Sequence, residues 1–139
     1  MKHTTEYLLL CENVIVGEQG KASLINLYDR IFADTLPVAA PAMYFAFSVS
    51  LTNDSENELP IQLELKILAP DGKPLDTNLQ INALKLPHDA VSQKIGGAIA
   101  VQALTFSVYG DYRANFTIND SLIGTKVFAV SPPPGEIAK

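Results

Sequence analysis

Hydrophobic and polar residues alternate one by one along most of this chain. The segment 61–67 reads IQLELKI, so its apolar residues fall at odd positions and its polar residues at even positions. The same period of two runs through 112–118 (YRANFTI) and through 45–52 (FAFSVSLT). Successive side chains of a β-strand point to opposite faces of a sheet, so this pattern predicts strands with one buried face. No segment sustains a helical period.

Short segments rich in glycine, proline and asparagine separate these strands. They are Gly17–Lys21, Asn53–Pro60, Pro70–Lys73 and Asn119–Ser121. In the third of them, proline presets φ and Gly72 accepts the positive φ that a tight hairpin turn needs. Two longer connections are expected: a helical turn or short strand within Asp29–Pro41, and a loop with one helical turn within Pro87–Gly97. The alternation changes phase near Ala103, which indicates a bulge or a strand that moves between sheets.

The pattern predicts an all-β fold of seven or eight strands. Short strands joined by tight turns are typical of a two-sheet antiparallel β-sandwich, immunoglobulin-like or jelly-roll-like. At 139 residues the chain is long enough for one domain with its own core. We assign residues 1–131 to a single sandwich domain. Residues 132–139 form a flexible, proline-rich C-terminal tail in this prediction, because three consecutive prolines cannot pair as a strand.

One strand is expected to end at Gly110-Asp111, and Tyr112 follows at once, near the start of the penultimate strand. In immunoglobulin-type sandwiches a tyrosine at this place bonds through its hydroxyl to backbone a few residues upstream. A half-polar aromatic residue at a strand start is usually packed, with its hydroxyl satisfied. We therefore expect structural roles for Tyr112 and for the turn glycines Gly72 and Gly110, rather than contact with a ligand.

An acidic balance narrows the range of partners. The formal net charge is −5, the pI is about 4.8, and the two arginines are Arg30 and Arg113. Nucleic acids and anionic lipids both attract clustered cations, so we expect no nucleic-acid partner and no membrane partner. No stretch approaches the roughly 18 apolar residues of a membrane span. The lone cysteine, Cys11, fits a reducing compartment and predicts a cytoplasmic location.

Residues with catalytic potential are few. His3 lies near the start of the chain, and His88 lies beside Asp89 in a predicted loop, where a histidine is more often solvated than catalytic. Cys11 falls inside a predicted strand and is expected to be a small buried hydrophobic residue. The chain has no nucleophile elbow, no glycine-rich phosphate loop and no Cys/His spacing suited to zinc. We therefore predict a protein that is not an enzyme and holds no cofactor.

Charged loop residues fall into two groups if each strand crosses the sandwich once. Asp54, Glu56 and Glu58 occupy alternate positions in one loop and offer carboxylates suited to Ca²⁺, although sandwich loops are also polar simply because they are wet. The opposite end collects residues that suit either a small ligand or an Arg–carboxylate network that holds the loops. They are Asp29, Arg30, Asp71, Asp111 and Arg113.

The strands also offer surfaces to other chains. Exposed strand edges pair with further strands unless they are blocked. Apolar residues occupy positions that face outward in the predicted pattern: Tyr44, Ala46, Ala98 and Ala100. Such a face predicts contact with an unidentified protein partner or with a second copy of the chain, and hence a homo-oligomer joined by edge or by face.

The segment Tyr7–Val49 also carries a recognisable order of residues. Hydrophobic residues are followed by Cys-Glu-Asn at 11–13, a Gly-Lys turn, LINLYDRI, and a proline-bounded segment before an aromatic-rich strand. The Pro-Asp-Gly hairpin at 70–72 and the segment Gly110–Val130 complete the pattern. In these features the chain resembles an uncharacterised bacterial family of small single-domain β-sandwich proteins. The resemblance implies a β-sandwich, assigns no activity and transfers no catalytic residue. The positions that it marks for testing are Cys11, Glu12, Asn13, Asp29 and Arg30.

With so little chemistry, the sequence favours binding over catalysis. The main hypothesis is a non-catalytic β-sandwich module that acts through protein–protein interaction or self-association. The alternative is a small-ligand or Ca²⁺ binding module that uses the loop carboxylates at one end of the sandwich.

Overall fold

A computed structural model describes residues 2–18, 21–54, 57–75, 79–86, 89–101 and 104–134. Within these ranges the chain forms eleven strands and no α-helix. The strands are β1 (Lys2–Val16), β2 (Ala22–Leu27), β3 (Arg30–Phe32), β4 (Val38–Ala39), β5 (Met43–Asn53), β6 (Leu59–Leu68), β7 (Leu79–Leu86), β8 (Asp89–Val101), β9 (Thr105–Phe106), β10 (Gly110–Ile118) and β11 (Ser121–Ser131).

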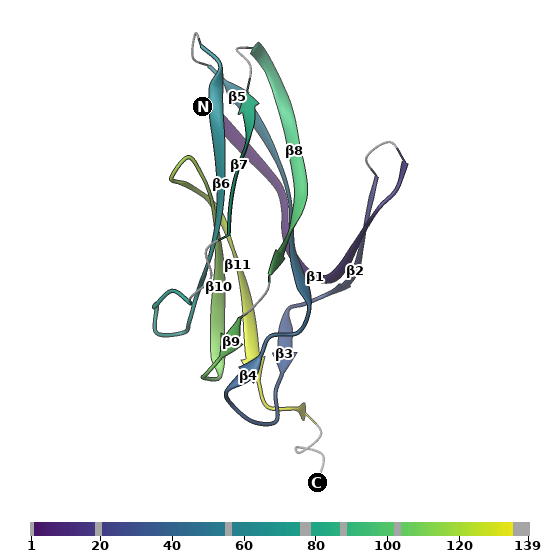
Figure 1. The fold of residues 1–139 in the computed structure, drawn as a ribbon, viewed down its shortest axis with the longest axis vertical. Helices are drawn as coiled ribbons and strands as arrows, with labels where there is room; N and C mark the ends of the chain where they lie inside the picture. Colours follow the sequence, from purple (N-terminus) through teal and green to yellow (C-terminus); the bar gives the residue numbers. More distant parts are fainter. Residues whose placement is uncertain are drawn as a thin grey trace.

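The strands form two sheets that face each other, with a small third sheet at one end (Figure 1). Sheet A has the strand order β2-β1-β5-β8, and sheet B has the order β3-β11-β10-β6-β7. The third sheet consists of β4 and β9. The short strand β3 runs parallel to β11, and the other pairings are antiparallel. The predicted all-β, two-sheet antiparallel sandwich is therefore confirmed.

The strand order matches the immunoglobulin alternative rather than the jelly roll. An immunoglobulin-type domain places strands A, B and E side by side in one sheet and C, F and G in the other. Here β1, β5 and β8 occupy the places of A, B and E, while β6, β10 and β11 occupy those of C, F and G. β7 extends the second sheet beside β6, as an additional strand does in variable-type domains.

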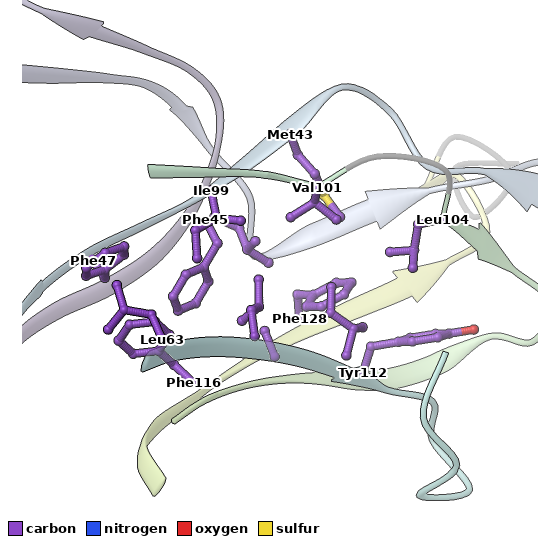
Figure 2. Packing of buried hydrophobic residues seen from close by; sticks show 14 of the residues in the cluster. Met43, Phe45, Phe47, Leu63, Ile99, Val101, Leu104, Tyr112, Phe116 and Phe128 are labelled. Carbon is purple, nitrogen blue, oxygen red and sulfur yellow. The ribbon is translucent and has the colours of Figure 1, made fainter. Parts of the chain in front are cut away.

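The core lies between the sheets, where their inward-facing apolar residues meet (Figure 2). The predicted inward rows are buried at odd positions 45–51 of β5, odd positions 61–67 of β6 and even positions 112–118 of β10. Phe45 and Phe47 of sheet A pack on Phe116 of sheet B, with ring centroids 5.4 and 4.7 Å apart. Burial of apolar surface is the dominant favourable term in folding, so these contacts hold the two sheets together.

Tyr112 has the geometry of a tyrosine corner. Its side chain is buried, and its hydroxyl donates to the backbone oxygen of Val108 at 2.7 Å. The ring packs against Phe106 and Phe128, with centroid distances of 4.9 and 5.7 Å. Figure 2 shows the hydroxyl at the rim of this aromatic cluster. The hydrogen bond engages the hydroxyl within the fold and ties the loop before β10 to the core.

Two of the turn glycines have backbone conformations that other residues rarely adopt. Gly72 has a φ of +88° and sits in the β6 turn, where its N–H donates to Ala69 O at 2.8 Å. Gly110 has a φ of +136°, and a Cβ atom there would lie 2.9 Å from Cγ of Pro70. Both positions therefore favour glycine through φ, and Gly110 does so through close packing as well.

The expectation of a loop with a helical turn over Pro87–Gly97 is wrong, because residues 89–97 belong to the long strand β8. Residues 93–101 pair with β5 in a regular antiparallel register. This ladder holds the segment extended even though Gly96 and Gly97 interrupt its apolar alternation.

For two further segments the sequence left two structures open, and the structure shows which one forms. Asp29–Pro41 contains the short strands β3 and β4. The phase change near Ala103 falls between β8 in sheet A and β9 in the third sheet, so the chain does move between sheets there. β11 ends at Ser131. Residues 135–139 lie outside the described residues, so the flexible tail stays a prediction.

Replacing Tyr112 with Phe removes the corner hydroxyl and keeps the ring. We expect the free energy of unfolding to fall by about 1 kcal/mol, the net contribution of a typical hydrogen bond. Tyr109→Phe is the matched control: that hydroxyl also donates to a backbone oxygen, of Ala33 at 2.8 Å, but the residue is 39% exposed, so water can replace the bond. Urea denaturation measures both losses, and an equal or larger loss in the control would contradict the role given to Tyr112.

Gly110→Ala should destabilise the fold more than Gly72→Ala. Each variant forces a residue with a Cβ atom into a positive φ, which costs about 1–3 kcal/mol. At Gly72 nothing lies within 4 Å of the added Cβ, whereas at Gly110 the ring of Pro70 must also move. The two unfolding free energies can be compared directly, and a Gly110 variant as stable as the Gly72 variant would show that the contact with Pro70 relaxes freely.

Candidate functional site

β1 is longer than the part of it that belongs to the sandwich. Residues 2–5 and 7–11 pair with β5, and the last pair joins Cys11 to Tyr44. Cys11 also pairs with Leu27 of β2, and from Asn13 to Val16 the strand pairs with β2 alone. These segments form a hairpin that stands away from the sandwich on the outer side of sheet A (Figure 1). We call this hairpin, residues 12–16 and 22–26, the arm.

Hydrogen bonds brace the base of the arm. Asn26 adopts a positive φ of 54°, and its Nδ2 donates to Oε2 of Glu12 at 2.8 Å. Next to it, the backbone N–H of Tyr28 donates to Leu10 O at 2.8 Å. Asparagine tolerates this left-handed conformation better than most residues. The Cys-Glu-Asn motif noted in the sequence therefore lies where the arm leaves the sheet.

Cys11 is buried at the same base, as predicted, with an exposed fraction of 0%. Burial raises the pKa of its thiol above the ordinary value of 9.0. Its Sγ donates a long hydrogen bond, 3.8 Å, to the backbone oxygen of Tyr44. A buried thiol with a raised pKa forms little thiolate, which is the reactive species, so Cys11 acts as a packing residue.

An open groove of about 560 Å³ lies between the arm and the outer face of sheet A. Its floor is formed by Tyr7 of β1, Ser48 of β5 and Gly96, Gly97 and Ala98 of β8. Its opposite wall is formed by Val14, Ala22 and Leu24 of the arm. The glycine and alanine residues of β8 have small side chains or none, so they leave space above the sheet, and the arm lines that space with apolar side chains. The volume falls within the range of binding pockets in proteins.

One end of the groove is polar. Lys94 Nζ lies 3.0 Å from Oε1 of Glu6, and Ser48 Oγ donates to the same oxygen at 3.3 Å. The carboxylate of Glu6 is thus already engaged by a cation and a hydroxyl. Among the described lining residues there is no nucleophile with a free general base beside it. The arrangement can bind a chain or a ligand.

β8 borders this groove and has an open edge. In the described part of the chain it is hydrogen-bonded to β5 alone. Proline is absent from the strand, and residues 95–101 carry no charge. At the other lateral side of the sandwich the sheets close on each other: Thr5 Oγ1 donates to Ile123 O at 3.4 Å, and a Cβ on Gly124 would collide with Leu8. On this open side the terminal strands are β8 of sheet A and β7 of sheet B, and it is β8 whose uncharged stretch borders the groove.

Three of the five predicted ligand residues come together. Asp71, Asp111 and Arg113 line a pocket of about 300 Å³ beside the Pro70–Gly72 turn, and all three are exposed. Arg30 lies in the same cross-strand row as Asp111, with Ala129 of β11 between them.

Asp29 is directed elsewhere. Its Oδ1 accepts a hydrogen bond from Nζ of Lys126 at 2.7 Å. This bond, and the charge of Lys126, lower the pKa of Asp29 below its ordinary 3.8. Asp29 therefore forms an ion pair within the fold and is not part of the pocket.

The predicted metal residues lie around the β5–β6 connection. Asp54 and Glu58 are exposed there, and Glu56 lies outside the described residues. Asn53 is buried and donates from Nδ2 to Asn57 O at 2.8 Å, which closes the turn internally. Among the described residues no group of three or more His, Cys, Asp or Glu side chains is placed to hold a metal ion.

The structure places some of the apolar residues that were predicted to face outward at the surface and buries one of them. Of the outward apolar residues, Ala98 is exposed, Tyr44 and Ala100 are half-buried, and Ala46 is buried at 1% exposure. Ala46 is therefore not available to a partner. His88 lies outside the described residues, so its predicted solvation stays a prediction. In the ranges that the structure covers, no helix has the length and apolar character needed to cross a membrane.

A known family covers nearly the whole of this sandwich. The model of the family described as "Family of unknown function (DUF6941)" matches residues 6–131. The chain belongs to this family. The match confirms the resemblance to an uncharacterised family and brings no activity to any residue. No curated protein is a significant match to the chain.

Two solved structures are similar to the chain at a distance. One is an immunoglobulin-like protein from Pseudomonas aeruginosa, with 16% identity, a TM-score of 0.40, and coverage of 94% of this chain and 97% of that chain. The other is the alkylpurine DNA glycosylase AlkC of Pseudomonas fluorescens bound to DNA with an abasic-site analogue, with 11% identity and a TM-score of 0.48. That similarity covers 89% of this chain, which spans 30% of the glycosylase chain. Neither similarity carries a conclusion about function.

The Asp29–Lys126 pair predicts a small pH dependence of stability. Because the folded-state pKa of Asp29 is lowered, its stabilisation is present above pH 3.8 and is lost as the pH falls through the folded-state pKa. Asp29→Asn should therefore lower the free energy of unfolding slightly at neutral pH, and the difference from the wild type should shrink below pH 3.8. In the background Lys126→Met, which keeps an apolar stem, Asp29→Asn should have little effect at either pH. Urea denaturation across pH measures this, and a difference that persists unchanged in acid would contradict the ion pair.

Proposed function

We propose that this protein is a non-catalytic interaction module that accepts an extended segment of another polypeptide along the open edge of β8. The observation that carries this proposal is the edge itself. β8 has 13 residues and is bonded to β5 on one side, with no other described strand on its second side. A row of unpaired backbone N–H and C=O groups is a template for a further strand. Domains that bind peptides in this way gain affinity from the backbone bonds and specificity from pockets for alternate side chains.

The groove beside β8 suits that second requirement. Alternate side chains of an added strand would point to the outer face of sheet A, next to Gly96 and Ala98, where the floor is low. Val14 and Leu24 of the arm face that space and offer apolar contacts. The favoured partner is therefore an extended segment with apolar residues at alternate positions.

Charge and chemistry agree with a non-enzymatic role. In the groove, Glu6 is paired with Lys94, which leaves it poorly suited to act as a general base. The chain has one cysteine and so cannot form a disulfide within itself, which agrees with a cytoplasmic location.

The small-ligand alternative has weaker support. Asp71, Asp111 and Arg113 do share a pocket, but all three are exposed, and interactions between exposed charges are weakened by water and salt. For Ca²⁺, Asp54 and Glu58 are the described candidates, and they do not form a three-ligand group with other described residues.

Selection of peptides tests the proposed function. Sparse immobilisation keeps copies of the protein apart, so that the β8 edge is free whatever the protein does in solution. Phage-displayed random peptides can then be selected for binding. We expect the selected peptides to carry apolar residues at alternate positions, because one face of an added strand lies against the groove.

Paired variants show whether those peptides bind at β8. Gly96→Lys combined with Ala98→Lys places two long charged side chains on the exposed outer face of β8 and should abolish binding, since lysine on an edge strand opposes further pairing. Thr125→Lys combined with Val127→Lys adds the same charges to an exposed face of β11 and should leave binding unchanged. If selection yields no peptide above background, or if the selected peptides bind both variants equally well, the proposed function is wrong.

A further inference from the structure

We infer that the strand accepted by β8 is β8 of a second copy of this chain. This inference rests on the proposed function, because it needs the same open edge, and it goes further by naming the partner. The two strands would run antiparallel, related by a two-fold axis that lies midway between the two copies of Gly97. Each sheet A would continue into the other, and the order β2-β1-β5-β8 would be doubled into one eight-stranded sheet.

The sequence of the edge is symmetric about Gly97. Residues 95–99 read Ile-Gly-Gly-Ala-Ile, so apolar branched residues flank a centre of small residues on both sides. Antiparallel pairing about this centre places Ile95 opposite Ile99 and Gly96 opposite Ala98. An interface with two-fold symmetry is self-complementary, because each residue contacts its counterpart in both directions. Residues 95–99 have that property in their sequence, with Gly96 and Ala98 as the one unequal pair.

On the face of β8 that points into the sandwich, this pairing would bring together isoleucine residues that already pack at the core or its rim. Ile99 is buried and Ile95 is half-buried against the core at the rim of the sandwich. The ring of Phe47 lies over Gly97, since a Cβ on that glycine would be 3.4 Å from Cζ of the ring. Pairing would place the Ile95 side chain of one copy beside Ile99 of the other. Branched cross-strand pairs of this kind stabilise sheets.

On the outer side, the residues that would face a second strand are small. Gly96 and Ala98 are both exposed, so neither brings a bulky side chain to the centre of the contact. The nearest charge, Lys94, is directed to Glu6 of its own chain at 3.0 Å and would stand opposite Ala100 of the partner copy. The two arms would lie on the same side of the joined sheet.

Sedimentation of the full chain gives the first measurement. From micromolar to millimolar concentration, the wild type should approach twice the 15.0 kDa mass of one chain. Gly96→Lys combined with Ala98→Lys places lysines directly opposite each other across the proposed axis, and like charges in directly opposed positions oppose pairing. This variant should remain monomeric, whereas Thr125→Lys combined with Val127→Lys should dimerise as the wild type does. Circular dichroism and thermal unfolding confirm that both variants are folded.

Disulfide cross-linking tests the register without relying on disruption. Chains carrying Gly96→Cys, mixed with chains carrying Ala98→Cys, would bring two thiols into a directly opposed pair, with Cβ atoms about 4.5–5.5 Å apart. Either variant alone would place its thiols diagonally, at about 7–8 Å, too far for an unstrained disulfide. Oxidation should therefore yield several times more covalent dimer from the mixture than from either variant alone. Wild-type chains should not cross-link, because Cys11 is buried.

The outcomes separate this inference from the function on which it rests. A wild type that stays monomeric to millimolar concentration, or a dimer that survives the lysine pair on β8, overturns self-pairing. So does cross-linking that does not depend on the mixture. If the monomeric protein still binds selected peptides at β8, the proposed function stands and the partner is a different chain. If neither peptides nor a second copy bind at β8, both fail.

Discussion

The packing of Phe45 and Phe47 on Phe116 joins the two sheets, and the remaining surfaces of the molecule follow from it. These rings occupy the inner face of β5 in the middle of sheet A, so the inner face of that sheet is committed to the core. β1 then covers one flank of β5, and its contacts with β11 close that side of the sandwich. β8 covers the other flank and has no described neighbour beyond it. What sheet A can offer a partner is its outer face and this edge.

The arm gives that edge a distinct environment. An isolated two-stranded hairpin is marginally stable in water, and the arm depends on its base for support. The bond from Asn26 to Glu12 and the burial of Cys11 supply that support. The arm leaves the sheet on the outer side, so it forms one wall of the groove beside β8. Its residues Val14 and Leu24 supply the apolar wall of the groove that Gly96 and Ala98 also line.

The parts of the fold that sequence could predict are those with strong alternation. β5, β6 and β10 each have one fully buried face, and period-two burial leaves a clear pattern in their residues. Tyr112 was recognisable because its position relative to the penultimate strand is set by the immunoglobulin arrangement. The first part of β8, residues 89–97, was expected to be a loop because Gly96 and Gly97 interrupt the alternation and Pro87 suggested a turn. The symmetry of residues 95–99 about Gly97 can be read in the sequence. It indicates self-pairing only once the strand is known to lie at the edge of a sheet.

The candidate site was less predictable for a different reason. The groove depends on where β1 parts from β5 after Cys11, and the sequence of β1 reads as one strand that does not mark that point. Charged loop residues, in contrast, were grouped by assuming that each strand crosses the sandwich once. This assumption brought Asp71, Asp111 and Arg113 together correctly, because they belong to adjacent strands and turns of sheet B. It could not foresee that Asp29 pairs with Lys126, whose side chain comes from the inner side of β11.

Amide hydrogen exchange of residues 95–101, followed as a function of protein concentration, tests the central claim that the β8 edge receives a strand from another copy. Amides on the open side of an edge strand exchange readily, and a newly paired strand protects them. We predict that protection in this segment rises with concentration while the amides of β5 and β10 stay unchanged. Exchange in residues 95–101 that is the same at every concentration would contradict the claim.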